Sequence, residues 1–139
     1  MTRITLSATE PEDDASGTLY RALRPDVDFR FVSVAEGDGY EVAREHSTGG
    51  WGRISGGVVL IDPFEVPAGE DDAFLAGWDD ARAVLAEQQG YLGARLYRAT
   101  GPADFRFVGL TRWSSPLMVQ RASTKGIPVP SRPALYQPV

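Results

Sequence analysis

The sequence contains one segment twice, about half the chain apart. Residues 19–32 read LYRALRPDVDFRFV and residues 96–108 read LYRATGPADFRFV, with ten identical positions once one gap is allowed. The segment mixes aromatic, basic, acidic and turn residues, so low complexity does not explain the match. A repeat with so long a period indicates two copies of one structural unit rather than a solenoid of many short repeats.

The two copies differ in length upstream of this segment. The acidic motif Glu-Asp-Asp-Ala begins at Glu12 in the first copy and at Glu70 in the second. It starts 7 residues before Leu19 but 26 residues before Leu96. The difference, 19 residues, is roughly the length of one helix with its connections. We therefore expect the first copy to lack a helix that the second copy has.

Residues 1–55 are the expected helix-less half. Short apolar runs predict strands at 4–8, 18–23 and 28–35, the last two as an antiparallel hairpin. Residues 37–51 are polar and rich in glycine, which predicts a loop with one helical turn at 40–45. A fourth strand is a further option at 51–55.

Residues 56–139 are the expected complete half, with the order β-α-β-β-α-β. A helix is predicted between Glu70 and Gly90, because Phe74, Trp78, Ala81 and Leu85 fall on one helical face. The remaining elements are a strand at 58–66, a hairpin of 91–99 and 105–113, a short helix from 114 to 122 and a last strand at 134–139. Each half would leave one apolar face of its sheet unpaired, so we expect an α+β fold in which two antiparallel sheets pack face to face.

Composition excludes several classes of protein. With 139 residues and 42% hydrophobic content, the chain can form one compact unit. The net charge of −5 argues against a nucleic-acid partner. No apolar run is long enough for a membrane span, and the first residues lack the apolar core of a signal peptide. Cysteine is absent, which removes disulfides and thiolate chemistry. We expect a cytoplasmic protein without a membrane partner.

Residues 57–139 resemble the antibiotic biosynthesis monooxygenase family. The residues that carry the resemblance are Ile61–Pro67, Trp78, Gly90–Leu92, Leu96–Arg98, Phe105–Val108, Trp113 and Pro133–Tyr136. The resemblance implies ferredoxin-like antiparallel sheets that form an α+β barrel, with a pocket between sheet and helices. It also implies cofactor-free oxygenation of anthrone-like rings. Gly109 and Tyr97 stand where members often have an Asn and a His.

Members of that family build the barrel from two chains. The repeat suggests instead that one chain closes it as an intrachain pseudo-dimer, with a homodimer of second halves as the alternative. Only the second half keeps the helix, and Gly37 stands in the first half at the place of Trp113. We therefore expect one pocket per chain, in the second half, with the first half kept for its sheet-packing surface.

An aromatic stripe is the candidate substrate-binding surface. By the period of two along a strand, Phe105, Phe107, Gly109 and Trp113 share one face. If this face meets the helix that carries Phe74 and Trp78, the residues line an aromatic cavity, and the glycine leaves room in it. The alternative is an ordinary hydrophobic core. The expected ligand is a hydrophobic aromatic small molecule.

Polar residues near this stripe are the candidate catalytic groups. Tyr97 could donate to a developing phenolate, and Arg95 shares its strand face. Trp113 completes the expected catalytic set. Asp62 lies in an apolar strand, where its carboxyl would have a raised pKa or form a salt bridge to an arginine. His46, the single histidine, is expected in an exposed loop.

The sequence offers no metal-ligand spacing and no phosphate-binding loop. We therefore expect no metal and no cofactor, and a colourless purified protein. The leading hypothesis is a cofactor-independent tailoring enzyme of aromatic polyketide or related secondary metabolism that oxygenates a phenolic or anthrone-like ring. The alternatives are a cofactor-free polyketide cyclase or isomerase, and a non-catalytic small-molecule-binding protein of the same fold.

Overall fold

The computed structural model describes residues 1–11, 17–47, 57–121 and 129–139. These residues contain eight strands and two helices. In chain order they are β1 (Thr2–Ser7), β2 (Thr18–Ala22), β3 (Phe31–Glu36), β4 (Tyr40–Ser47), β5 (Val58–Phe64), α1 (Asp71–Ala86), β6 (Tyr91–Ala99), β7 (Phe107–Trp113), α2 (Pro116–Arg121) and β8 (Ala134–Pro138).

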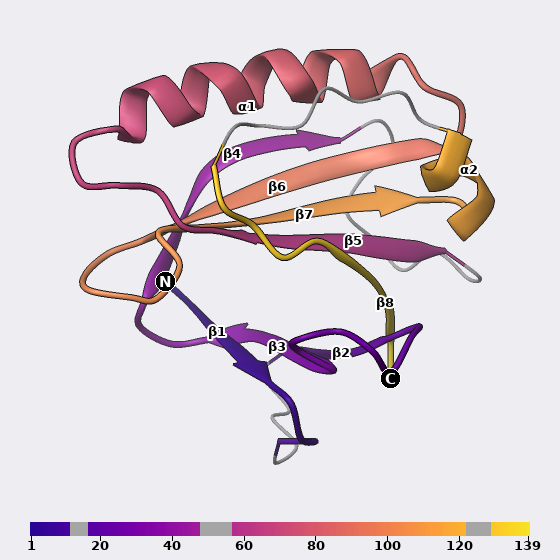
Figure 1. The fold of residues 1–139 in the computed structure, drawn as a ribbon, viewed down its shortest axis with the longest axis horizontal. Helices are drawn as coiled ribbons and strands as arrows, with labels where there is room; N and C mark the ends of the chain where they lie inside the picture. The colour runs from indigo at the N-terminus through magenta and orange to yellow at the C-terminus, as the bar shows by residue number, and fades with distance from the viewer. Residues whose placement is uncertain (12–16, 48–56, 122–128) are drawn as a thin grey trace.

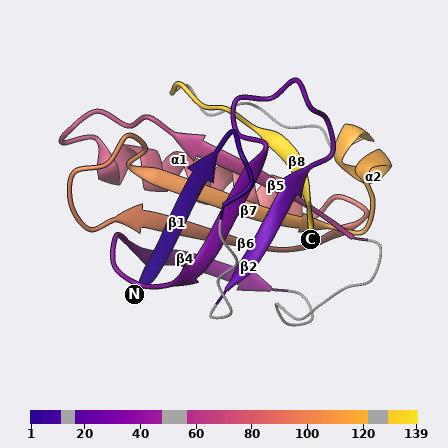
Figure 2. The same cartoon turned by 90° about the horizontal axis from the view of Figure 1, so that it is seen from below.

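The eight strands form one closed antiparallel barrel within the chain. The order around the barrel is β1-β3-β2-β8-β5-β7-β6-β4. Each half therefore has the same internal order: β4-β1-β3-β2 in the first and β8-β5-β7-β6 in the second. The pairs β2–β8 and β4–β6 join the halves. Figures 1 and 2 show β1 and β2 on one side, the sheet of β5, β6 and β7 in the middle, and α1 on the other side. The expected intrachain barrel is confirmed.

The repeated segments occupy matching places in this barrel. Tyr20 of β2 lies opposite Val32, and Tyr97 of β6 lies opposite Val108. The backbone hydrogen bonds that close the two hairpins also match: Ala22 N–H donates to Arg30 O and Ala99 N–H donates to Arg106 O, both at 2.8 Å.

The two halves meet through equivalent residues. The rings of Phe29 and Phe105, which pair in the repeat, meet edge to face with centroids 5.7 Å apart. Tyr40 donates its hydroxyl hydrogen to Phe105 O at 2.9 Å, and Tyr136 donates its own to Phe29 O. Each half thus supplies a tyrosine that bonds to the backbone of the other half.

The sheet of the second half separates two hydrophobic clusters. The barrel interior is one, and we call the other, between α1 and this sheet, the helix–sheet layer. Buried residues of the barrel interior are Tyr20, Val32, Tyr40, Val59, Ile61, Tyr97, Ala99, Phe105, Val108, Leu110 and Tyr136. Buried residues of the helix–sheet layer are Val58, Phe64, Phe74, Leu75, Trp78, Tyr91, Ala94, Leu96, Phe107 and Trp113.

Helix α1 begins where the sequence predicts but ends earlier. Asp71 and Asp72 place negative charge on its first turn, where the free N–H groups lie. The helix ends at Ala86 with Glu87 as its C-cap, four residues before the predicted stop at Gly90. Gly90, with φ of 89°, instead forms the turn directly before β6. Two ion pairs connect α1 to both halves: Asp71 with Arg106 at 2.7 Å and Asp79 with Arg44 of β4 at 3.1 Å.

The first half has no helix among its described residues. Its sheet presents polar residues such as Thr5, Arg21 and Ser33 on the outward face. Phe31 lies on the same face opposite Arg21, and like its repeat partner Phe107 it is buried. The two outward faces therefore share this phenylalanine and differ at the surrounding positions, where polar residues can stay in contact with water.

The stretch from residue 37 to 51 is where the sequence prediction was wrong. Residues 40–47 form strand β4 rather than a loop with a helical turn. The strand is polar because its charged side chains pair with the neighbouring elements: Glu41 with Arg98, Arg44 with Asp79 and Glu45 with Arg95. The other predicted strands and both helices are confirmed. The acidic motif that begins at Glu12 and the optional strand at 51–55 lie outside the described residues. No helix within the described ranges is long and apolar enough to cross a membrane.

The shared barrel interior predicts that both halves unfold together. Phe105→Ala removes a ring that contacts both halves, so we expect a loss of about 3–5 kcal/mol in unfolding free energy. Hydrogen exchange should show β3 and β7 amides losing protection in one transition. Val42→Ala, at a position that is 48% exposed, is the control and should change little. Two separate transitions would contradict a single core.

We also expect a mass near 15.1 kDa in sedimentation equilibrium.

Candidate active site

The residues predicted as a site fall on two sides of the sheet. Trp113, Phe107, Phe74 and Trp78 lie in the helix–sheet layer. Tyr97 and Phe105 lie in the barrel interior, and Arg95 donates to the Tyr97 hydroxyl at 3.3 Å. The structure therefore does not bring Tyr97 and Arg95 together with Trp113.

The expected position of Phe105 was wrong. The sequence placed it on the same face as Phe107 by the period of two. Strand β7 begins only at Phe107, so the alternation does not extend back to Phe105. Its ring turns into the barrel and packs against Phe29.

Arg95 and Tyr97 belong to a polar group inside the barrel. Arg95 forms an ion pair with Glu45 at 2.9 Å in addition to its hydrogen bond to Tyr97. Tyr20, the repeat partner of Tyr97, lies close enough to interact with Arg112, Tyr97 and Arg95. Burial raises the pKa of the Tyr20 hydroxyl. This group joins the two halves through charged and phenolic side chains.

Aromatic rings fill the centre of the helix–sheet layer. Phe74 stacks on Phe107 with ring centroids 4.5 Å apart and meets Phe64 at 4.9 Å. A Cβ added at Gly109 would lie 3.4 Å from the Phe64 ring and 3.5 Å from Nε1 of Trp78. The glycine thus makes room for the rings of these neighbours, which occupy the space where the sequence suggested a cavity.

Asp62 places a carboxylate beside this apolar layer. It lies opposite Gly109 in the β5–β7 pair. Ser131 and the backbone of Arg132 lie close enough to the carboxylate to lower its pKa, while its Oδ1 is buried with no hydrogen-bond partner among the described residues. Burial raises the pKa of Asp62 to about 7. Asp62 forms no salt bridge with a described arginine, and the guanidinium of the neighbouring Arg132 pairs instead with Asp28 at 2.8 Å.

Trp113 is the second group with an unpartnered polar atom in this region. Its side chain is 1% exposed, and its Nε1–H has no acceptor within the described part of the chain. By alternation Trp113 and Asp62 point to the same side of the sheet. Trp113 is four residues beyond Gly109, the partner of Asp62, which corresponds to about 13 Å along the strand. The helix-facing side of the sheet thus carries two unsatisfied polar groups, one toward each end.

The sequence analysis missed a histidine and a tyrosine that meet next to Trp113. His46 Nδ1 lies 2.8 Å from the Tyr91 hydroxyl. The Tyr91 ring meets Trp113 edge to face at 5.8 Å. Burial raises the pKa of the Tyr91 hydroxyl, and the nearby Arg82 of α1 offsets part of this shift. His46 is therefore half-buried in a strand, and the expectation of an exposed loop was wrong.

Two β-bulges explain why alternation did not reveal this pair. The register of β4 shifts between Val42 and Arg44, and that of β6 shifts between Tyr91 and Gly93. One extra residue reverses the side to which the following side chains point. The bulges turn both His46 and Tyr91 toward the helix–sheet layer, although simple counting places each on the barrel side.

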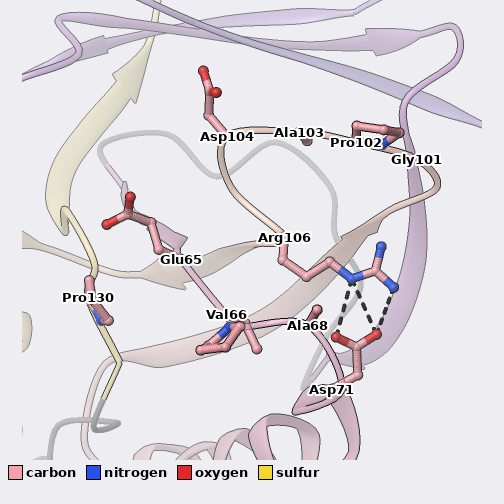
Figure 3. A pocket seen from close by; sticks show the side chains of 12 residues that line it. Glu65, Val66, Ala68, Asp71, Gly101, Pro102, Ala103, Asp104, Arg106 and Pro130 are labelled. Atoms are coloured by element: carbon pink, nitrogen blue, oxygen red, sulfur yellow. Dashed lines mark hydrogen bonds and ion pairs between the residues drawn. The ribbon is translucent and has the colours of Figure 1, made fainter.

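An open pocket of about 720 Å³ lies at the N-terminal end of α1, as Figure 3 shows. The loop 65–71, the hairpin loop 101–106 and Pro130 line it. Arg106 points at Asp71 and is held by it through hydrogen bonds of 2.7–3.2 Å. Neither the predicted catalytic residues Arg95, Tyr97 and Trp113 nor the residues of the predicted aromatic stripe line this pocket. In the described part of the chain, no group of three or more His, Asp or Glu residues is placed to hold a metal ion.

Asp62 predicts a measurable dependence of stability on pH. Its pKa in the folded protein is about 7, against 3.8 as the ordinary value, so folding favours the protonated form. The stability from this form is complete below the ordinary pKa and is lost as the pH rises through about 7. We expect the wild-type protein to lose about 2–3 kcal/mol more than Asp62→Asn between pH 5 and pH 8. Urea unfolding at both pH values measures this, and parallel losses in the two proteins would refute it.

Comparison with known proteins identifies solved structures with a similar fold. No protein-family model matches the sequence, and no curated protein matches it. The solved structures do match. A heme-degrading enzyme of Listeria monocytogenes, LmHde, has 18% identity, a TM-score of 0.56, and coverage of 98% of this chain and 97% of its own. An uncharacterised ferredoxin-fold protein related to antibiotic biosynthesis monooxygenases, from Listeria monocytogenes 4b F2365, has 16% identity, a TM-score of 0.54, and coverage of 98% and 93%. At these identities the likeness concerns the fold, which extends over nearly the whole chain.

One solved structure is similar in sequence as well. It is a protein of Shewanella loihica PV-4 described as a "putative monooxygenase", with 31% identity and a TM-score of 0.55. The match covers 61% of this chain and 96% of the Shewanella protein. The chain therefore belongs to the same family as the Shewanella protein, among monooxygenase-like proteins with a ferredoxin-like fold.

Proposed function

We propose that this protein is a cofactor-independent tailoring enzyme of aromatic polyketide or related secondary metabolism, and a member of the antibiotic biosynthesis monooxygenase family. Its reaction would be oxygenation of a phenolic or anthrone-like ring in the helix–sheet layer. The observation that carries the proposal is the pair of unpartnered polar atoms on one side of the sheet, Trp113 Nε1 and Asp62 Oδ1. The family relationship to a monooxygenase-like protein supports the same reaction class.

The unpartnered atoms indicate the chemistry of the ligand. A buried polar group without a hydrogen bond costs about 1–3 kcal/mol, so a ligand that satisfies it gains that free energy. A flat apolar molecule with oxygen atoms toward both ends would accept from Trp113 at one end and bond to Asp62 at the other. Phe107 and the α1 residues Phe74 and Trp78 offer aromatic faces to the rings.

Binding in this layer requires the rings of α1 to move. Phe74 and Trp78 now occupy the space beside Gly109 and Phe107. Both belong to one helix, whose buried contacts with the sheet are made by Phe74, Leu75 and Trp78. In our proposal the rings of the substrate take the place of the contacts between the aromatic rings of α1 and those of the sheet. At Gly109, which has no side chain, the substrate can come closest to the backbone of the sheet.

The proposed reaction needs dioxygen as its oxidant. An anthrone loses a proton to give an electron-rich enolate, which transfers electrons to O₂. The ring CH₂ becomes C=O, one O₂ is consumed and one water is released for each quinone. The protein's part is to bind the ring, stabilise the enolate oxygen with donors such as Trp113, and exclude bulk water.

The barrel interior is the rival location. Tyr97 and Arg95, the catalytic candidates of the sequence analysis, would stabilise a phenolate there rather than beside Trp113. We consider the barrel interior the weaker candidate, because Arg95 already pairs with Glu45 and with the Tyr97 hydroxyl. Tyr97→Phe distinguishes the two locations from each other.

The proposal predicts turnover of 1,8-dihydroxyanthrone. The purified, colourless protein should accelerate oxygen uptake, measured with an oxygen electrode, together with quinone absorbance. Trp113→Phe keeps a ring but removes the N–H, so we expect kcat/KM to fall about tenfold. The matched control is Tyr40→Phe, which removes a buried hydroxyl from the barrel interior.

Three outcomes would change the assignment. Product formation without oxygen uptake would identify a cyclase or isomerase, and binding without turnover would identify a binding protein. A loss confined to Tyr97→Phe, at unchanged melting temperature, would move the site into the barrel. Stoichiometric haem or flavin absorbance in the purified protein would refute the cofactor-independent reaction.

A further inference from the structure

We propose that His46 and Tyr91 form a proton-accepting dyad at the Trp113 end of the helix–sheet layer, and that the helix-less first half supplies its base. This inference rests on the proposed function, since it assigns a role within the same site. Strand β4 of the first half carries His46, and β6 of the second half carries Tyr91. The site would then be complete only when both halves of the chain contribute.

The backbone is shaped to bring these two side chains together. His46 lies opposite Ala94 in the β4–β6 pair, and each strand carries a bulge beside its member of the dyad. Without the bulge in β4, His46 would point into the barrel. Without the bulge in β6, Tyr91 would point away from Trp113. A bulge changes the direction of the following side chains and interrupts the regular hydrogen bonds between the strands. Bulges are frequent beside active sites.

The hydrogen bonds around Tyr91 suit a proton relay. In the tautomer with its proton on Nε2, His46 accepts the Tyr91 hydroxyl hydrogen at Nδ1, across 2.8 Å. Arg82 of α1 lies near the same hydroxyl, where its charge favours negative charge on the phenolic oxygen. The Tyr91 ring lies against Trp113, whose indole N–H lacks an acceptor.

The charged groups near the dyad belong to α1, β4 and β6. Arg82 belongs to α1, and Asp79 of α1 is paired with Arg44 of β4 at 3.1 Å. Glu45, the neighbour of His46, is paired with Arg95 on the barrel side of the sheet. Asp79 and Glu45, the described carboxylates near the dyad, are thus already paired with arginines.

The proposed step transfers one proton and no electrons. The acidic hydroxyl of the bound phenol or enol gives its proton to the Tyr91 oxygen as Tyr91 passes its own proton to His46 Nδ1. The ligand becomes an anion, Tyr91 is neutral again, and His46 becomes an imidazolium with protons on both nitrogens. The new anion accepts a hydrogen bond from Trp113 Nε1, which satisfies that group. Reaction with O₂ is a separate, later step.

Turnover variants test whether proton transfer, rather than a hydrogen bond alone, is needed. His46→Gln keeps an acceptor for Tyr91 but cannot become cationic, and Tyr91→Phe keeps the ring against Trp113 but removes the relay. With 1,8-dihydroxyanthrone we expect each variant to lower kcat by about 10²–10⁴-fold with KM within about threefold. Tyr40→Phe is again the matched control. A wild-type kcat in His46→Gln would overturn the proposal.

A spectroscopic test separates this inference from the proposed function. Because the chain has one histidine, the imidazole NMR signals of His46 need no assignment by mutation. Under argon, adding the same probe to wild-type protein should move these signals toward the imidazolium position and produce the absorbance of the probe anion. Tyr91→Phe should bind the probe without either change.

The outcomes differ for the two proposals. Binding and oxygen uptake without a change at His46 would refute the dyad and leave the proposed function standing. Failure of the wild-type protein to bind the probe or to consume oxygen with it would refute the proposed function, and the dyad with it.

Discussion

The contact between the two halves inside the barrel is the constraint on which the other features depend. Phe29 and Phe105 meet across the interior, and Tyr40 and Tyr136 each bond to the backbone next to the opposite phenylalanine. A four-stranded sheet with an apolar face is stable only when that face is covered. Since each half covers the other, neither half needs a partner chain for this purpose, and the faces that point outward are free to differ.

The outward faces have in fact become different. The second half keeps α1 over an aromatic face, whereas the outward face of the first half combines polar positions such as Thr5 and Ser33 with the buried Phe31. The first half still reaches the helix–sheet layer, because β4 pairs with β6 and Arg44 of β4 holds Asp79 of α1. In our proposal the first half thus serves the site beneath α1 from the side, without a helix of its own among the described residues.

The sequence predicts the architecture well where local pattern and structure agree. The repeat and the alternation of apolar residues identify seven strands and both helices, and the repeat suggests the closed barrel. The candidate site was harder, because bulges in β4 and β6 reverse the alternation that places His46 and Tyr91. The sequence did not predict strand β4, because many of its side chains form ion pairs with neighbouring elements rather than apolar contacts. Phe105 was misplaced because it lies before the strand whose period was used.

The unpartnered groups lie where the fold can tolerate them. Each buried unsatisfied polar atom costs about 1–3 kcal/mol, a large share of a typical stability of about 5–15 kcal/mol. In the barrel interior such a cost would weaken the contact that joins the halves, and there Tyr40 and Tyr136 both have acceptors. Trp113 and Asp62 lie instead on the other side of the sheet, under a helix that packs through three buried residues. Destabilisation there loosens the cover of the layer without opening the barrel, which is the arrangement that a ligand entering beneath α1 requires.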